Sequence, residues 1–218
     1  MADNDGDKKI PGCKVVLLGD SGVGKTCLIS RYISGTYDPN SASTNGASYA
    51  SKKVTYEKLN KSLVLDIWDT AGQEKYKALT KFFYKDAAVA ILVYDITLRQ
   101  SYDNLKDYWY KQIKENGDKN MVLGVAGNKS DLYENEAVPE AEAREFAESI
   151  GAIFGLTSAQ VNTGVTELFM DAGNKYLDPS FQQKMQEEKE EKEETTGQKI
   201  TLEKEKVDKK EKKKKSWC

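Results

Sequence analysis

A glycine-rich run near the N-terminus has the residue types and spacing of a phosphate-binding loop. Gly19 to Thr26 reads GDSGVGKT and matches the pattern G-x-x-x-x-G-K-[ST] at every fixed position. In such a loop the glycines let successive backbone N–H groups face the phosphates, Lys25 places a positive charge beside them, and Thr26 offers its hydroxyl to Mg²⁺. The run lies between an apolar stretch and a helical pattern, so the phosphates would also meet a helix N-terminus. The sequence therefore predicts a nucleoside triphosphate site.

Two polar segments further along the chain predict which base this site holds. They are Asn128-Lys129-Ser130-Asp131 and Thr157-Ser158-Ala159, and each follows an expected strand. The Asp131 carboxylate can accept hydrogen bonds from an N1–H and an exocyclic amine in one plane, a donor pair that guanine has and adenine lacks. The Asn128 amide can bridge the base edge to neighbouring loops, and the Lys129 stem can lie over the ring. The backbone N–H of Ala159 can donate to the O6 acceptor of the base. These segments predict GTP and not ATP.

A third polar segment predicts contacts with the metal and the terminal phosphate. It reads Trp68-Asp69-Thr70-Ala71-Gly72-Gln73-Glu74 and also follows an expected strand. An acidic residue at a strand end, here Asp69, can hold Mg²⁺ through water. The glycine, Gly72, lets its backbone N–H reach a γ-phosphate.

Apolar stretches and helical spacings alternate along the chain and must position these segments. We expect strands at about 13–19, 47–57, 62–68, 87–94, 121–127 and 152–157, and helices at about 25–34, 76–84, 102–116, 139–149 and 163–177. This alternation predicts an α/β fold with a six-stranded, mostly parallel sheet and helices on both faces. The turn at 58–61 leaves no room for a crossover helix, so the strands beside it should form an antiparallel hairpin at one edge. Ligands in such sheets lie beyond the carboxyl ends of the strands, where the polar segments fall.

Composition excludes several other classes of function. The chain has 218 residues, 39% of them hydrophobic, which is enough for one substantial core. Its 33 basic and 35 acidic residues are nearly balanced, which gives no electrostatic case for nucleic-acid binding. It contains no histidine, so histidine-based catalysis and histidine-ligated metals are excluded, and its three cysteines lack metal-ligand spacing. We expect a reducing, cytoplasmic location, with no signal peptide and no membrane span.

Taken together, these segments resemble the Ras superfamily of small GTPases and, within it, the Rab family. The resemblance covers about residues 12–177, and its motifs match in order and approximate spacing. It extends to Tyr94-Asp95-Ile96-Thr97, and Ser43-Thr44 with Gly46-Ala47 is similar to the early-endosomal subgroup. The resemblance implies the P-loop small-GTPase fold for a GTP-binding domain at 12–177, after a flexible N-terminus at 1–11. The core should be monomeric.

The resemblance implies GTP or GDP with Mg²⁺ as cofactors and gives roles to particular residues. Thr44 matches the threonine whose hydroxyl joins Mg²⁺, beside Thr26 and the water-mediated Asp69, and whose backbone senses the γ-phosphate. Gln73 matches the glutamine that orients the attacking water, so catalysis would rest on Gln73, Lys25 and Thr44. The remaining nucleotide-binding positions that it implies are Ser21, Gly22, Val23, Gly24, Cys27, Tyr37, Gly72, Ser158 and Gln160.

Three positions depart from the family pattern. Ser21 stands where Ras has glycine, a substitution common among Rab proteins, and we expect hydrolysis to survive it. Gln160 stands where the family usually has lysine, and because Ala159 would contact the base through its backbone, we expect a modest change in affinity. Asn45 replaces an apolar residue, which changes the surface that an effector would meet.

Three aromatic residues match the triad through which Rab proteins present a surface to effectors. They are Tyr49, Trp68 and Phe83. The resemblance implies that GTP tethers the segments around Thr44 and Gly72 to the γ-phosphate and that the loss of this phosphate releases them. Partners would then read the order of these loops. We expect as partners effectors, an exchange factor, a GTPase-activating protein, and a GDP-dissociation inhibitor or escort protein.

The composition changes sharply beyond about Asp178. The segment 178–218 is dense in charged residues and reads as a disordered tail. Its last ten residues hold six lysines and one glutamate and end in Ser216-Trp217-Cys218. In this family such an end resembles a lipid anchor supported by an electrostatic attraction to anionic lipids. We expect prenylation of Cys218 by the Rab-type route, although most Rab proteins carry two terminal cysteines. The protein would then cycle between the cytoplasm and the cytoplasmic face of endomembranes, with endosomes as one destination.

The sequence as a whole predicts a GTP-hydrolysing switch of Rab type that regulates vesicle traffic by recruiting effectors to membranes. Two alternatives stay open. A binding module could hold GTP and barely hydrolyse it, which Gln73 argues against. A metabolic phosphotransferase could use the same loop, but it would need a second substrate site, for which the motifs leave little chain.

Overall fold

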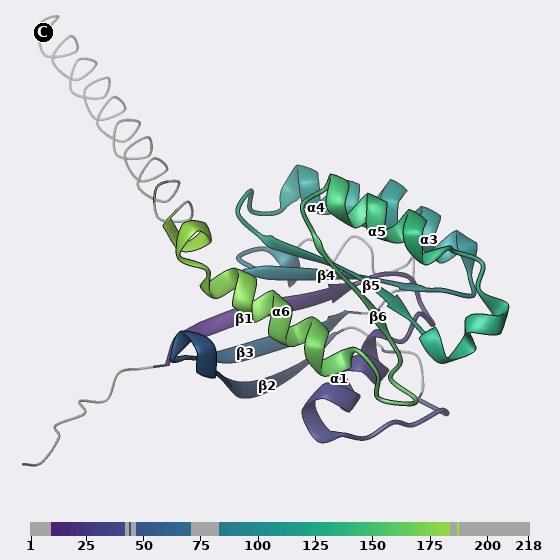
Figure 1. The fold of residues 1–218 in the computed structure, drawn as a ribbon, viewed down its shortest axis with the longest axis horizontal. Helices are drawn as coiled ribbons and strands as arrows, with labels where there is room; N and C mark the ends of the chain where they lie inside the picture. The colour runs from purple at the N-terminus through teal and green to yellow at the C-terminus, as the bar shows by residue number, and fades with distance from the viewer. Residues whose placement is uncertain (1–9, 42–43, 45–46, 71–82, 184–186, 188–218) are drawn as a thin grey trace, which may run out of the picture. The chain divides into compact units, whose positions relative to one another are not determined.

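The computed structural model describes residues 10–41, 44, 47–70, 83–183 and 187. Its centre is a six-stranded sheet with the strand order β2-β3-β1-β4-β5-β6. The strands are β1 (Gly12–Leu18), β2 (Ala47–Tyr56), β3 (Lys61–Thr70), β4 (Val89–Asp95), β5 (Val122–Asn128) and β6 (Ile153–Thr157). Every pairing is parallel except that of β2 with β3. The expected fold, a mostly parallel sheet with one antiparallel edge strand, is confirmed (Figure 1).

The hairpin of β2 and β3 closes through a short 3₁₀ turn, η1 (Glu57–Leu59). Asn60 follows in the left-handed conformation, with φ 46°, which an asparagine tolerates better than most residues. The register pairs Tyr49 with Trp68 and Ala47 with Thr70. The pairing therefore brings the start of β2 beside the carboxyl end of β3, where the metal-binding segment was expected.

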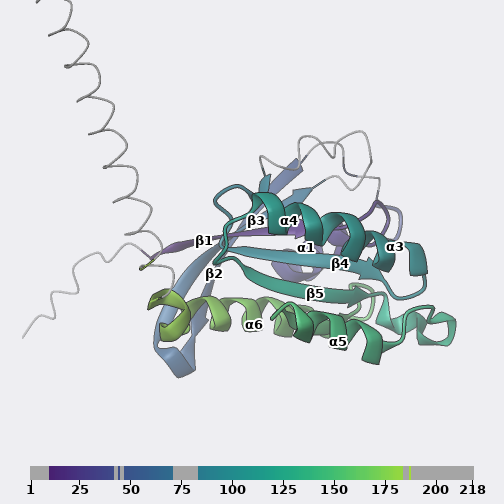
Figure 2. The same cartoon turned by 90° about the horizontal axis from the view of Figure 1, so that it is seen from above.

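Helices cover both faces of the sheet. The longer ones are α1 (Lys25–Ser34), α5 (Glu140–Ser149) and α6 (Val165–Leu177), and a short 3₁₀ segment, η4 (Ser130–Asn135), follows β5. A continuous helical stretch is made of α3 (Arg99–Asn104), the π-helical η3 (Leu105–Tyr110) and α4 (Lys111–Asn116). Figure 2 shows α4 and α6 on opposite sides of the sheet. The sequence predicted this stretch from residue 102 and missed both its start and its π-helical centre.

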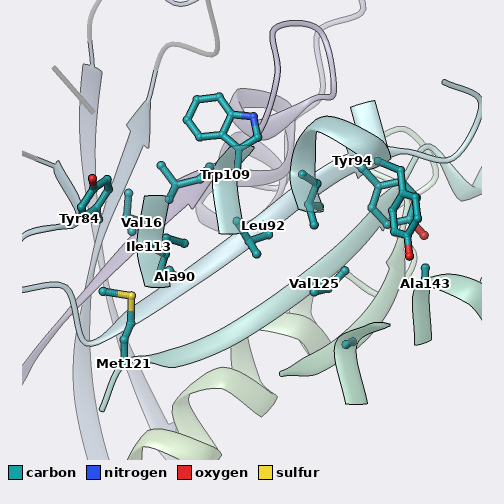
Figure 3. Packing of buried hydrophobic residues seen from close by; sticks show 14 of the residues in the cluster. Val16, Tyr84, Ala90, Leu92, Tyr94, Trp109, Ile113, Met121, Val125 and Ala143 are labelled. Carbon is teal, nitrogen blue, oxygen red and sulfur yellow. The ribbon is translucent and has the colours of Figure 1, made fainter. Parts of the chain in front are cut away.

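Alternating residues of the central strands point into two separate apolar layers. On β4, Ala90, Leu92 and Tyr94 lie in one buried cluster with Trp109 and Ile113 of the helical stretch, as Figure 3 shows. On the other face, Tyr32 of α1 stacks on Phe169 of α6 with ring centroids 4.1 Å apart. All seven residues of β4 are buried, as expected for a strand covered on both faces.

The chain divides into two compact units, Met1–Tyr176 and Leu177–Cys218. In the second unit, the described residues include Asp178, whose Oδ1 accepts a hydrogen bond from the backbone N–H of Ser180. Most of the tail expected at 178–218 and of the N-terminus expected at 1–11 lies outside the described residues, as does most of the helix expected at 76–84. The domain boundaries expected at residues 11 and 177 remain predictions.

Candidate nucleotide-binding site

A cavity of about 380 Å³ opens at the carboxyl ends of the strands. This volume lies in the usual range for small-ligand sites. The cavity is lined by Ser21, Gly22, Gly24, Lys25, Thr26, Cys27, Tyr37, Asp38, Pro39, Ser41, Thr44, Thr70, Asn128, Lys129, Asp131, Leu132, Ala159 and Gln160. The lining joins the phosphate loop, the segment after α1 and the two base-contacting segments, which are far apart in the sequence.

The phosphate loop has a backbone that only glycine adopts easily at three points, the first of which is Gly19 with φ 151°. Gly22 has φ 82° and Gly24 has φ 95°, both in the left-handed region. Gly24 also leaves no space for a side chain, because a Cβ there would overlap Nδ2 of Asn128. The loop is thus held directly against the segment that follows β5.

Lys25 is a buried cation at the bottom of the cavity. Its ammonium group donates to the carbonyl oxygens of Gly19, at 2.7 Å, and Asp20, at 2.8 Å. Burial lowers the pKa of Lys25 to about 8, and the negative charges of Asp69 and Asp20 oppose this shift. A phosphate group beside Lys25 would compensate the buried charge, so the lysine is suited to an anionic ligand.

Three oxygen-bearing side chains from different segments meet beside Lys25. Thr26 Oγ1 lies 2.6 Å from Asp69 Oδ2 and 2.6 Å from Thr44 Oγ1, and Thr44 Oγ1 lies 3.2 Å from the same carboxylate oxygen. The second oxygen, Asp69 Oδ1, is buried and has no hydrogen-bond partner among the residues that the structure describes. Burial raises the pKa of Asp69, opposed by hydrogen bonds from both threonines and by the Lys25 charge. Hydroxyl and carboxylate oxygens with an unused buried acceptor suit a hard divalent cation such as Mg²⁺.

The other end of the cavity holds the polar groups that sequence assigned to the base. Asn128 is buried, and its Nδ2 donates to the carbonyl of Val23 at 2.8 Å, which ties the strand end to the phosphate loop. Ser158 Oγ donates to Asp131 Oδ1 at 2.5 Å. This bond fixes the carboxylate and leaves it further acceptor capacity for a ligand. Lys129 pairs with Asp95 Oδ2 at 2.6 Å, which fixes its stem beside the cavity.

Arg31 of α1 connects the two walls of the base end. Its guanidinium donates to the carbonyls of Ala159, at 2.7 Å, Gln160, at 3.0 Å, and Gly35, at 2.5 Å. Tyr37 Oη lies 3.5 Å from Gln160 Oε1 and brings the segment after α1 toward the same loop. The sequence did not single out Arg31, because its helical spacing alone gives no sign that it faces three carbonyl oxygens.

Most of the residues that sequence reasoning selected lie together in this cavity. Val23, Asp69 and Ser158 are not in its lining. They bond to residues that are: Val23 to Asn128, Asp69 to Thr26 and Thr44, and Ser158 to Asp131. Gly72 and Gln73 lie outside the described residues. The lining residues that sequence reasoning missed are Asp38, Pro39, Ser41, Thr70 and Leu132. These residues could have been suggested by their nearness in the sequence to the selected residues Tyr37, Asp69 and Asp131.

The three aromatic residues expected at the effector surface form a row. Tyr49 and Trp68 make an edge-to-face contact at 5.4 Å between centroids, and Trp68 lies 6.2 Å from Phe83. Tyr49 is 56% exposed, and its hydroxyl donates to Asp66 at 2.6 Å. Lys14 Nζ lies 5.4 Å from the Trp68 ring centroid. The row is therefore a surface feature with an exposed end, and its use by effectors remains a prediction.

Comparison with known proteins agrees with this site and fold. The family model described as the Ras family matches residues 14–178. The Ras-related protein Rab-22A of Homo sapiens is 44% identical over 163 residues, which are 74% of this chain and 82% of that protein. The Ras-related protein Rab-31 of Homo sapiens is 44% identical over 169 residues, which are 76% of this chain and 85% of that protein. The Mus musculus Rab-31 is 46% identical over 157 residues, 72% of this chain and 78% of that protein.

A phosphate-loop motif after the first strand of a mostly parallel sheet, in one cavity with polar residues at the ends of β5 and β6, is typical of a P-loop nucleotide-binding protein. The chain belongs to the Ras family, and its relatives place it among the Rab proteins. It is a small GTPase of Rab type that binds guanine nucleotides, hydrolyses GTP and regulates vesicle traffic. The corresponding predictions from sequence are confirmed.

Proposed function

We propose that the cavity is the guanine-nucleotide site and that its residues hold the roles which the sequence suggested. The observation that carries this proposal is the meeting of Lys25, Asn128 and Asp131 in one cavity of about 380 Å³. The phosphate loop binds the phosphates at one end, and Asp131 with the backbone of Ala159 reads the base at the other. The lining residue Cys27 borders the phosphates, and Tyr37 borders the base.

Mg²⁺ is the proposed metal, held by the hydroxyls of Thr26 and Thr44 and, through water, by Asp69. When bound, it would neutralise charge on the β- and γ-phosphates. The support is the convergence of these oxygens and the unpartnered Asp69 Oδ1.

Removal of the metal should release GDP from this protein faster. With EDTA, we expect GDP dissociation to accelerate by about a hundredfold, which corresponds to a loss of about 3 kcal/mol. The measurement is the fluorescence decay of a labelled GDP in the presence of excess unlabelled GDP. In Asp69→Asn, EDTA should accelerate release little further. The control Asp66→Asn changes a neighbouring acid on β3 that bonds to the Tyr49 hydroxyl and not to Thr26 or Thr44, and it should respond to EDTA like the parent. An unchanged rate in the parent protein would contradict the metal assignment.

Gln73 is the proposed water-positioning residue, with Lys25 and Thr44 completing the catalytic group. Replacing Gln73 by Leu should lower single-turnover GTP hydrolysis by about a hundredfold, because the attacking water loses its hydrogen-bonding partner. Phosphate release from preloaded protein measures this rate, and GDP affinity should stay at the parent value. Parent-like hydrolysis in Gln73→Leu would refute the role. That result would mean that another group orients the attacking water.

The proposed cellular role is switching at the cytoplasmic face of endomembranes, including endosomes, with effectors reading the row of Tyr49, Trp68 and Phe83. The exchange factor, GTPase-activating protein and GDP-dissociation inhibitor or escort protein are the partners that the Rab family implies in general. In the described part of the chain, no helix has the length and apolarity needed to cross a bilayer. We propose that the core is monomeric and binds no nucleic acid.

Attachment to the membrane is proposed to occur through a prenylated Cys218 and the lysines that precede it. A tagged Cys218→Ser protein should lose membrane attachment and become diffuse in live-cell images, because one lipid chain plus a basic segment provides the anchoring. Cys13→Ser changes a buried cysteine of β1 and should leave attachment unchanged in any variant that folds. An intact mass showing unmodified Cys218 in protein isolated from its native cells would refute the proposed modification.

A further inference from the structure

The phosphate loop has one carboxylate that the nucleotide site does not use. Asp20 accepts two hydrogen bonds from the helical stretch that covers the sheet: Asn104 Nδ2 donates to Oδ2 at 2.6 Å, and Trp109 Nε1 donates to Oδ1 at 2.8 Å. Each carboxylate oxygen therefore has a neutral donor. Both donors lie more than eighty positions away in the sequence.

Both donors are themselves fixed. Trp109 is 1% exposed and belongs to the buried cluster of Figure 3, so its indole cannot turn freely. The Asn104 amide oxygen accepts a hydrogen bond from Gln100 Nε2 at 2.9 Å, which orients the amide nitrogen toward Asp20. The buried Trp109 and the half-buried Asn104 thus hold Asp20 through neutral donors.

The π-helical segment explains how two residues five positions apart reach the same carboxylate. In an α-helix, five positions separate two side chains by about 140° around the axis, so they would point to different sides. A turn of π-helix contains about one residue more than a turn of α-helix, since its hydrogen bonds run from i to i+5. The segment η3 (Leu105–Tyr110) lies between Asn104 and Lys111 and brings Asn104 and Trp109 to the same side.

Asp20 is linked in turn to the phosphate-binding lysine. Its backbone carbonyl accepts a hydrogen bond from Lys25 Nζ at 2.8 Å, while its side chain is held from the helix. An unbonded carboxylate in this loop would be free to turn toward the bound phosphates, where like charges repel. Two donors on its oxygens keep the negative charge directed at the helix and keep the loop in one conformation.

We propose that Asn104 and Trp109 are positioning residues for guanine-nucleotide binding, acting through Asp20, and that η3 sets the spacing that lets both reach it. The proposal rests on the function proposed above for the phosphate loop. Because Asp20 is part of the loop facing the phosphates that GDP and GTP share, loss of either donor should weaken both nucleotides by the same factor. Changes at Thr44 would instead affect GTP selectively.

Release rates of labelled GDP and of a labelled non-hydrolysable GTP analogue test the donors. Asn104→Ala and Trp109→Phe should each accelerate release of both ligands by about tenfold, the effect of losing a hydrogen bond to a charged group. The control, Asn116→Ala, removes a helical asparagine that bonds within its own helix to the carbonyl of Gln112. Melting temperatures of the same samples identify any variant that fails to fold. Equal release rates for Asn104→Ala and the control would overturn the proposal.

Changing the length of η3 tests the spacing without removing a donor. Deleting Asp107, whose side chain is 73% exposed, leaves Asn104 and the tryptophan four positions apart, which an α-helix brings to within about 40° of each other. We expect this protein to release nucleotides at the parent rate. Inserting an alanine after Asp107 should accelerate nucleotide release by as much as the loss of both hydrogen-bond donors does. If the deletion and the insertion accelerate release equally, the role proposed for η3 is wrong. A different result would count against the nucleotide site itself. If neither the parent protein nor any variant binds labelled GDP above the buffer control, the proposed nucleotide site is wrong.

Discussion

Replacing Asp131 by Asn should convert the proposed guanine site into one that prefers xanthine. The carboxylate can accept from both the N1–H and the exocyclic amine of guanine, whereas an amide offers one acceptor and one donor. The amide donor would face the guanine amine without pairing, so we expect GTP affinity to fall by about 10³-fold, or about 4 kcal/mol. Xanthosine triphosphate carries a carbonyl in place of the amine and should bind more tightly to the variant than GTP does. Competition against labelled GDP measures both affinities.

Asp38→Asn is the matched control for this exchange. Asp38 lines the same cavity, and its Oδ1 accepts a hydrogen bond from the backbone N–H of Asn40. An amide oxygen can accept that bond equally well, so we expect GTP to remain preferred over xanthosine triphosphate by the parent ratio. Unchanged base preference in Asp131→Asn would show that the base is read elsewhere in the cavity.

Replacing Gly24 by Ala should weaken both GDP and GTP by a hundredfold or more. The added Cβ would overlap Nδ2 of Asn128, whose donation to the Val23 carbonyl holds the loop in place, and Gly24 has a left-handed backbone. The backbone strain alone costs about 1–2 kcal/mol, and displacing a buried amide from its partner adds about 1–3 kcal/mol. Equilibrium titration with labelled GDP measures the loss, and the melting temperature without nucleotide measures the cost to the fold.

Gly151→Ala separates the two contributions. Gly151 also has a left-handed backbone, with φ 64°, but a Cβ there would meet no atom within 4 Å, and the residue does not line the cavity. This variant should lose about 1–2 kcal/mol of stability and keep the parent's nucleotide affinity. If Gly24→Ala binds GDP as tightly as Gly151→Ala does, contact with Asn128 is unimportant for binding.

The site could be predicted where its chemistry is written in short, contiguous motifs. Lys25, Asp69 and Asp131 each lie within a segment whose residue types suit one part of a nucleotide. The segments of Lys25 and Asp131 follow a strand, and Asp69 lies at the carboxyl end of β3. The carboxyl ends of parallel strands lie at one edge of a sheet, so the strand pattern alone brings these segments together. The antiparallel edge strand followed from a connection too short for a crossover.

Other contacts were not predictable because they join residues whose proximity depends on packing. Arg31 looks like any polar residue of a helix, yet it binds carbonyls 128 and 129 positions away. The π-helical turn between Asn104 and Lys111 leaves no clear mark on an apolar pattern read with an α-helical period. Neither the start of that helix nor its bond to Asp20 could be obtained from spacing.

The sequence by itself determined which side chains could form the nucleotide site, the order of the strands along the chain, and the membership of the Ras family. Local patterns are sufficient for these properties, because backbone preferences and motif chemistry depend on neighbours in the chain. Only the tertiary structure decided how the phosphate loop is held: Asn128 against Gly24 and Val23, and Asn104 with Trp109 on Asp20. These contacts depend on rotation and distance between packed elements, which a side chain's position in the sequence does not specify.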